Sequence, residues 1–128
     1  MEFLTNDKLL IVGAGGMIGS NMVQSALMLG LTPNICLYDI YEPGVHGVFD
    51  EMQQCAFEGA NLTYTVNAEE AFTGAKYIIS SGGAPRKEGM TREDLLKGNC
   101  QIAADFGDSL NISRPFNAIV LFPPRIVH

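Results

Sequence analysis

Short apolar runs alternate with longer amphipathic stretches along the chain. Five of the runs are rich in aliphatic, β-branched or aromatic residues, and each has the length of a single strand. They cover residues 9–12, 35–38, 62–66, 76–80 and 117–122. Four consecutive apolar residues, as in 9–12, are typical of a strand that is buried on both faces. The pattern therefore predicts five buried strands.

The stretches between the runs predict helices at about 16–30, 46–56, 68–72 and 91–110. In the first helix, the apolar positions at helical spacing are Ile18, Met22, Ala26 and Leu29. In the last helix, they are Leu96, Cys100, Ala103, Phe106 and Leu110. We expect each set to form the face that packs on the sheet.

Several residues indicate where these helices begin and end. Gly30 suits the end of the first helix, and Asn67 suits the N-cap of the short one. Thr91 and Asp94 have the spacing of a capping box. The dipeptide 43–44 is Pro-Gly, so residues 40–46 are expected to form a loop.

Strands that alternate with helices predict an α/β fold, with a parallel sheet and helices on both faces. Right-handed crossovers favour a doubly wound strand order of 3-2-1-4-5, as in a Rossmann-like domain. The first and fourth strands are then neighbours at the switch point of the sheet. Ligands of such folds bind there, beyond the carboxyl ends of the strands.

A glycine-rich turn follows the first strand. Gly13, Gly16 and Gly19 are spaced G-x-x-G-x-x-G, whereas the dinucleotide fingerprint G-x-G-x-x-G would need a glycine at Ile18. Gly13 would allow a tight turn, Gly16 would leave room for a pyrophosphate, and Gly19 would let the helix pack closely. The expected cofactor contacts here are Gly13, Gly15, Gly16, Met17, Ile18 and Gly19. A structural turn without a ligand is the alternative.

Two further segments follow strands that border this turn. Asp39 ends the second strand, twenty residues after Gly19. A carboxylate there accepts hydrogen bonds from both ribose hydroxyls of an adenosine and repels a 2′-phosphate, which favours NAD over NADP. Ser81, Gly82 and Gly83 follow the fourth strand and would lie beside the cofactor. The alternatives are a solvated aspartate and a plain turn.

Arg86 and Arg92 flank a glycine-containing loop before the long helix. Each guanidinium can bind a carboxylate through two hydrogen bonds, so together they could hold an anionic substrate. The alternative is two ordinary surface arginines. His46 and His128 are expected at the surface, and no catalytic triad is evident.

Composition narrows the class of protein. The net charge of −6 over 128 residues argues against nucleic acid or an anionic membrane as the main partner. No apolar run approaches the ~20 residues of a membrane span, and no signal peptide is evident. Cys36, Cys55 and Cys100 are expected to be reduced, buried or half-buried thiols without a metal. These features favour a cytoplasmic protein.

Residues 11–19, 37–39 and 80–96 together resemble the lactate/malate dehydrogenase family, and specifically its malate dehydrogenases. The resemblance implies that the glycine turn binds the pyrophosphate of NAD and that Asp39 binds the adenine ribose. It implies that Arg86 and Arg92 bind malate or oxaloacetate, and that Asn99 lies near cofactor and substrate. The implied reaction is reversible hydride transfer from C2 of malate to the nicotinamide.

The resemblance covers about 8–122, which corresponds to the NAD-binding domain alone. Pro123 stands where the family has an asparagine before a proline, and 123–128 form an atypical tail. We therefore expect one NAD-binding domain over 1–128, truncated before the substrate domain that carries the family's catalytic histidine. An uncovered apolar surface would then favour self-association.

Three functional hypotheses follow. The first is an NAD-dependent malate dehydrogenase by family. The second is a nucleotide-binding module that binds NAD without turnover, which the mechanism favours for this chain because no residue is placed for acid–base catalysis. The third is another Rossmann-like protein, such as a methyltransferase, which would not need the arginine loop.

Overall fold

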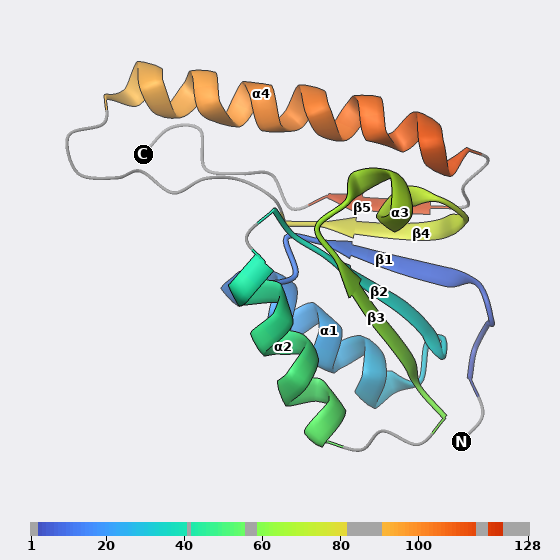
Figure 1. Ribbon diagram of the computed structural model, residues 1–128. Helices are drawn as coiled ribbons and strands as arrows, with labels where there is room; N and C mark the ends of the chain where they lie inside the picture. The colour runs from blue at the N-terminus through green and yellow to red at the C-terminus, as the bar shows by residue number, and fades with distance from the viewer. Residues whose placement is uncertain (1–2, 41, 56–58, 82–90, 115–117, 122–128) are drawn as a thin grey trace.

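The computed structural model describes residues 3–40, 42–55, 59–81, 91–114 and 118–121 (Figure 1). The strands are β1 (Lys8–Val12), β2 (Asn34–Tyr38), β3 (Asn61–Thr65), β4 (Ala75–Ser80) and β5 (Ala118–Leu121). The helices are α1 (Met17–Leu29), α2 (Glu42–Gln54), α3 (Ala68–Phe72) and α4 (Arg92–Leu110), and a short 3-10 helix, η1 (Asn111–Ser113), follows α4.

The five strands form one parallel sheet in the order β3-β2-β1-β4-β5, which confirms the predicted doubly wound topology. Val12 is paired with Tyr38 of β2 and with Ser80 of β4. The carboxyl ends of the three central strands therefore lie level with one another. The switch point falls between β1 and β4, as expected from the order.

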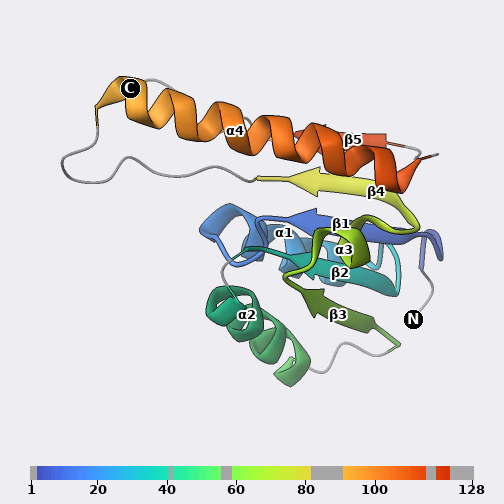
Figure 2. The ribbon, with the colours of Figure 1, turned by 45° about the horizontal axis from the view of Figure 1, so that its top comes forward.

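Helices cover both faces of the sheet, as Figures 1 and 2 show. On the face of α1 and α2, Leu9 and Ile11 pack with Val23 and Val45. On the opposite face, Leu10 packs in a second cluster that includes Phe72 of α3 and, at its edge, Phe106 and Leu110 of α4. Alternate residues of β1 serve the two cores, which explains why its apolar run is continuous.

The buried face of α1 differs from the predicted one. The buried residues are Gly19, Val23, Ala26 and Leu27. Ile18 is 49% exposed and Leu29 is 72% exposed, so only Ala26 of the predicted set is fully buried. The prediction was wrong because α1 makes a close contact with the glycine turn through Gly19, a residue that hydrophobicity does not mark. The buried stripe is thereby turned by one position.

The start of α2 also corrects the sequence interpretation. Residues 40–46 were expected to form a loop, but α2 begins at Glu42 and contains Pro43 and Gly44 in its first turn. A proline is tolerated there because the first N–H groups of a helix have no intrahelical acceptor. His46 therefore lies within the helix and not at its start.

The amino-terminal half of α4 extends past the end of the sheet (Figures 1 and 2). Cys100 and Ala103 are exposed, against the prediction, whereas Phe106 and Leu110 are half-buried as expected. The side chain of Leu96 lies outside the described part of the chain.

Of the three cysteines, Cys36 is buried and the other two are exposed. Cys36, in the middle of β2, is a buried free thiol, and burial raises its pKa. Cys55, just after α2, and Cys100 are free but exposed, so the expectation of burial was wrong for both. Cys55 lies beyond the last residue of α2, and Cys100 lies in the amino-terminal half of α4.

Candidate functional site

The glycine turn between β1 and α1 is tied to the end of β2. Gly13 has a φ of +80°, a conformation that favours glycine. The N–H groups of Gly13 and Ala14 both donate to the carbonyl oxygen of Tyr38, at 2.8 and 3.1 Å. The N–H of Gly16 donates back to the carbonyl oxygen of Gly13 at 3.1 Å. The chain therefore reverses direction within four residues and enters α1.

The glycines of this turn are required for different reasons. A Cβ at Gly19 would lie 2.1 Å from the carbonyl oxygen of Gly13, so α1 packs on the turn as predicted. A Cβ at Gly16 would meet only that same oxygen, at 3.4 Å, which is an ordinary contact. The fold itself thus leaves open space at Gly16, which suits the close approach of a ligand.

Gly15 has a larger role than the sequence indicated. A Cβ there would lie 3.0 Å from Oδ2 of Asp39 and 3.0 Å from the backbone nitrogen of Val45. The turn therefore packs directly against the end of β2 and the first turn of α2. From the sequence, Gly15 was expected only as a cofactor contact, and this packing was not predicted.

The start of α1 is open to a ligand. Its N-cap, Gly16, makes no side-chain hydrogen bond, and its first turn contains no acidic residue. Met17 is 83% exposed. The first N–H groups of a helix lack intrahelical acceptors and carry the positive end of the helix dipole. Such a start is a site for an anion.

Asp39 faces the glycine turn across the end of the sheet. Its Oδ2 accepts a hydrogen bond from the N–H of Gly15 at 3.0 Å, and its Oδ1 accepts one from the N–H of Ile40 at 2.8 Å. The residue is half-buried. The sequence placed this carboxylate at the correct strand end but did not predict its bond to the turn.

Tyr38, the last residue of β2, precedes this carboxylate. Burial raises the pKa of Tyr38, and the negative charges of Asp39 and Asp105 raise it further. The ring of Tyr38 packs edge-on against Phe72, with centroids 6.0 Å apart. Ionisation of the Tyr38 hydroxyl is therefore disfavoured.

Ser81 brings the end of β4 to the turn. Its N–H donates to the carbonyl oxygen of Val12 at 3.0 Å, and its hydroxyl lies 3.4 Å from the same oxygen. Gly82, Gly83 and Arg86 lie outside the described residues. The described part of this segment thus places the start of the second predicted turn beside the first.

The capping box predicted at the start of α4 is confirmed. The N–H of Asp94 donates to the hydroxyl of Thr91 at 3.1 Å, and the N–H of Thr91 donates to the carboxylate of Asp94 at 3.2 Å. Arg92 is the first residue of α4 and Asn99 lies further along it, but their side chains are not among those described.

Other features of the described chain offer less. A shallow hollow of about 340 Å³ lies at the amino ends of β1, β2 and β3, away from the glycine turn. Its polar groups bond to one another: Asn34 donates to the carbonyl of Asn6, and Asn61 to the side-chain oxygen of Asn34. No group of residues in the described ranges is arranged to hold a metal ion.

The one histidine among the described residues lies on α2, where it contacts Tyr64 and Asp50. His46 is exposed on α2, stacks on Tyr64 with centroids 5.1 Å apart, and lies 3.3 Å from the carboxylate of Asp50. None of the helices in the described ranges combines the length and apolar character that a membrane span requires.

A doubly wound parallel sheet, a glycine turn that leads into an uncapped helix and an acidic residue after the second strand together define a dinucleotide-binding domain. The model of the lactate/malate dehydrogenase NAD-binding domain matches residues 7–122. The chain belongs to the lactate/malate dehydrogenase family and contains its NAD-binding domain. This result excludes the methyltransferase alternative.

Individual relatives agree with this assignment. The cytoplasmic malate dehydrogenase of Taenia solium is 40% identical over 113 residues, covering 80% of this chain and 33% of the relative. That of Echinococcus granulosus is 37% identical over 112 residues, covering 81% and 34%. The crystal structure of malate dehydrogenase from Naegleria fowleri superposes with a TM-score of 0.73 at 27% identity, covering 94% and 39%. The chain thus spans about a third of the length of the curated relatives it matches.

Proposed function

We propose that this chain binds NAD across the carboxyl ends of β1, β2 and β4. The observation that carries the proposal is the position of Asp39 beside the uncapped start of α1, joined to it through the N–H of Gly15 at 3.0 Å. N–H donors for an anion and a carboxylate that can accept hydrogen bonds from hydroxyls therefore lie side by side. The diphosphate and the adenine ribose of NAD require this pair.

Each part of the site then has a role. The N–H groups at the start of α1, from Met17, Ile18 and Gly19, bind the diphosphate, and the open space at Gly16 admits it. Asp39 accepts hydrogen bonds from the adenine ribose. Ser81, with Gly82 and Gly83, borders the nicotinamide half, and Asn99 contacts cofactor and substrate, as the family resemblance implies.

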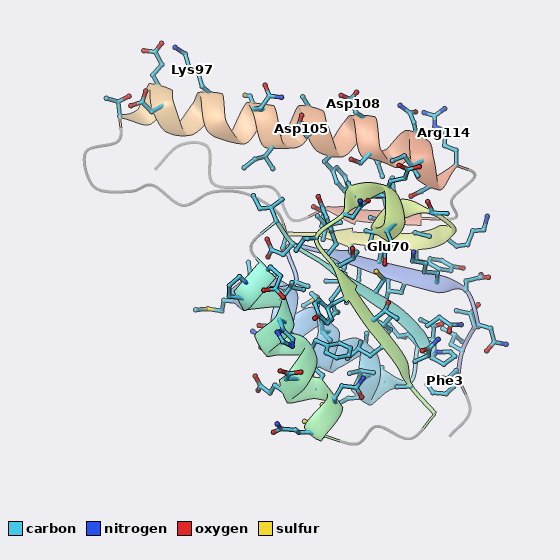
Figure 3. All side chains as sticks on the ribbon, viewed as in Figure 1. Phe3, Glu70, Lys97, Asp105, Asp108 and Arg114 are labelled. Atoms are coloured by element: carbon cyan, nitrogen blue, oxygen red, sulfur yellow. The ribbon has the colours of Figure 1, made fainter. Side chains whose placement is uncertain are left out.

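Cofactor selectivity provides the main test. We expect calorimetry to show binding of NAD, and binding of NADP at least about tenfold weaker, because the carboxylate of Asp39 repels a 2′-phosphate. Asp39→Ala should weaken NAD binding and reduce the discrimination. Asp108→Ala is the matched control, since Asp108 is an exposed aspartate on α4 (Figure 3). Absence of NAD binding at millimolar concentration would refute the proposal.

For the whole protein we propose the reversible NAD-dependent oxidation of malate to oxaloacetate. The support is the family assignment and the two relatives named malate dehydrogenase. Arg86 and Arg92 would bind the substrate carboxylates. NAD supplies the hydride acceptor when it is bound.

A polypeptide of these 128 residues is nevertheless expected to act as a binding module without turnover. General acid–base catalysis contributes about 10²–10⁴-fold, and His46 is engaged with Tyr64 and Asp50 on α2. Malate-dependent formation of NADH, followed by absorbance, should be undetectable. Turnover that disappears in Arg86→Ala would contradict this expectation and favour a complete active site.

We also propose a cytoplasmic location and self-association. Two relatives are named cytoplasmic enzymes. Met28 and Leu29 at the end of α1 are 64% and 72% exposed, which offers apolar surface for a second copy. Sedimentation of a single monomer species at high concentration would argue against association. The charge of −6 disfavours nucleic acid and anionic membranes as partners.

A further inference from the structure

Three successive N–H groups of the glycine turn are bound by the carboxyl end of β2. Gly13 and Ala14 donate to the backbone oxygen of Tyr38, and Gly15 donates to the carboxylate of Asp39. The other oxygen of Asp39 accepts from the N–H of Ile40 at 2.8 Å. A single carboxylate thus bridges two backbone segments, and Gly15 and Asp39 are 24 residues apart in the sequence.

We propose that Asp39 is a positioning residue that holds the glycine turn in its diphosphate-binding shape before any nucleotide arrives. This inference rests on the proposed NAD site but assigns Asp39 a task separate from its contact with the ribose. The contact is tightly packed, because a Cβ on Gly15 would lie 3.0 Å from Oδ2 of Asp39. A charged acceptor makes the hydrogen bond stronger than a neutral one.

The bond determines which N–H groups face the ligand. The N–H groups of residues 13–15 are bound to the end of β2, and that of Gly16 is bound to Gly13. The free donors are therefore those of the first turn of α1. Without Asp39, the N–H of Gly15 loses its acceptor, and the bonds from Gly13 and Ala14 to Tyr38 alone hold the turn to β2. The part of the turn that leads into α1 is then held less firmly in the orientation that aims the helix at the diphosphate.

The first test needs no nucleotide. Amide hydrogen exchange, measured residue by residue by NMR, should be about tenfold faster at Gly15 in Asp39→Ala than in the wild-type chain. The Glu70 amide, which donates to Asn67 at 3.1 Å, is the internal reference and should not change. A purely structural loss of stability would accelerate exchange at both amides, and Asp108→Ala should accelerate neither.

The second test separates the turn from the ribose. The probes are ADP and 2′,3′-dideoxy-ADP, which lacks the two hydroxyls that Asp39 would contact. If Asp39 holds the turn, Asp39→Ala weakens the dideoxy compound by at least about threefold. Removal of a nearby negative charge would by itself strengthen binding of a diphosphate, so weakening identifies the loss of positioning.

The outcomes are distinct. Unchanged exchange at Gly15, or equal or tighter binding of dideoxy-ADP, overturns the positioning role while leaving the NAD site intact. Failure of the wild-type chain to bind NAD overturns the proposed function, and the exchange result still decides the role of Asp39. If Asp39→Ala does not fold, Asp39→Asn replaces it. One amide oxygen cannot replace both carboxylate oxygens, so exchange should be faster at Gly15 or Ile40, and unchanged exchange at both overturns the proposal.

Discussion

The helices α1 and α4 begin in opposite ways. At α4, the side chains of Thr91 and Asp94 satisfy backbone N–H groups in a complete capping box, and the first turn carries Glu93 and Asp94. At α1, Gly16 offers no side chain and the first turn carries no acidic residue. The positive end of the α4 dipole is compensated by its own residues, whereas that of α1 is left for something else.

The difference indicates which helix start is built for a ligand. Among the helices in the described ranges, α3 also has a side-chain cap, from Asn67, and acidic residues in its first turn. The start of α1 departs from this pattern at the switch point of the sheet. A local cap that would stabilise the helix is absent where a bound anion would take its place.

The largest change is expected where α1 packs on the glycine turn. Gly19→Ala places a Cβ 2.1 Å from the Gly13 carbonyl oxygen, and the atoms in its way are backbone. We expect the free energy of unfolding, measured with urea, to fall by at least about 2 kcal/mol. The matched control is Gly107→Ala on α4, where a Cβ meets nothing within 4 Å. It should stabilise the chain by about 0.5–1 kcal/mol, and equal effects would contradict the packing role of Gly19.

The difference between the two helix starts can also be removed by giving α1 a capping side chain, as α4 has. Gly16 has a φ of −84° and a ψ of 174°, which any residue can adopt, and its Cβ position is open. Gly16→Asp should stabilise the nucleotide-free chain by a few tenths of a kcal/mol. It should weaken NAD binding by about tenfold or more, because a carboxylate then stands where the diphosphate binds.

The matched control for this change is Gly16→Ala, which adds a Cβ without a cap or a charge. Thermal unfolding without nucleotide and calorimetry with NAD measure the two effects separately. If Gly16→Asp binds NAD as tightly as the wild-type chain, the start of α1 is not the diphosphate site.

The sequence predicted the fold well where hydrophobic periodicity and helix-capping residues determine the structure. The β1 run, the Thr91–Asp94 spacing and the strand order were each confirmed. It failed for the buried face of α1, because hydrophobic periodicity does not register a contact made by a glycine. The close packing at Gly19 itself was predicted from the glycine spacing. The sequence also failed at Pro43, where a residue that breaks helices in their interior begins one.

The candidate site was predictable in position but not in its internal bonds. The glycine spacing and Asp39 marked the correct strand ends, since both follow directly from the topology. The bond between Gly15 and Asp39 depends on how α2 approaches the turn, with the Val45 nitrogen 3.0 Å from a Cβ on Gly15. Such tertiary geometry has no local sequence pattern. The roles of Arg86 and Arg92 stay predictions.

A smaller loss of stability than that of Gly19→Ala is expected at the capped start of α4. Thr91→Ala removes the hydroxyl that accepts from the Asp94 N–H at 3.1 Å, and should lower the free energy of unfolding by about 1 kcal/mol at neutral pH. NAD binding should be unchanged if α4 is capped for stability alone. Thr65→Ala is the control. The hydroxyl of Thr65 also accepts a backbone hydrogen bond, from the N–H of Asn67, but it lies in the turn before α3, away from the starts of α1 and α4.

The contribution of the α4 cap to stability should depend on pH, whereas the start of α1 should not show this dependence. Hydrogen bonds from Thr91 hold the pKa of Asp94 below its ordinary value of 3.8. A carboxyl whose pKa is lowered on folding stabilises the fold above its unfolded pKa, and that contribution is lost as the pH falls through the folded pKa. The difference in urea stability between Thr91→Ala and the wild-type chain should therefore shrink as the pH is lowered below about 4. The start of α1 has no carboxyl in its first turn, so Gly16→Ala should show no such convergence. A difference that stays constant to acid pH would mean that the Asp94 carboxylate does not contribute to the cap.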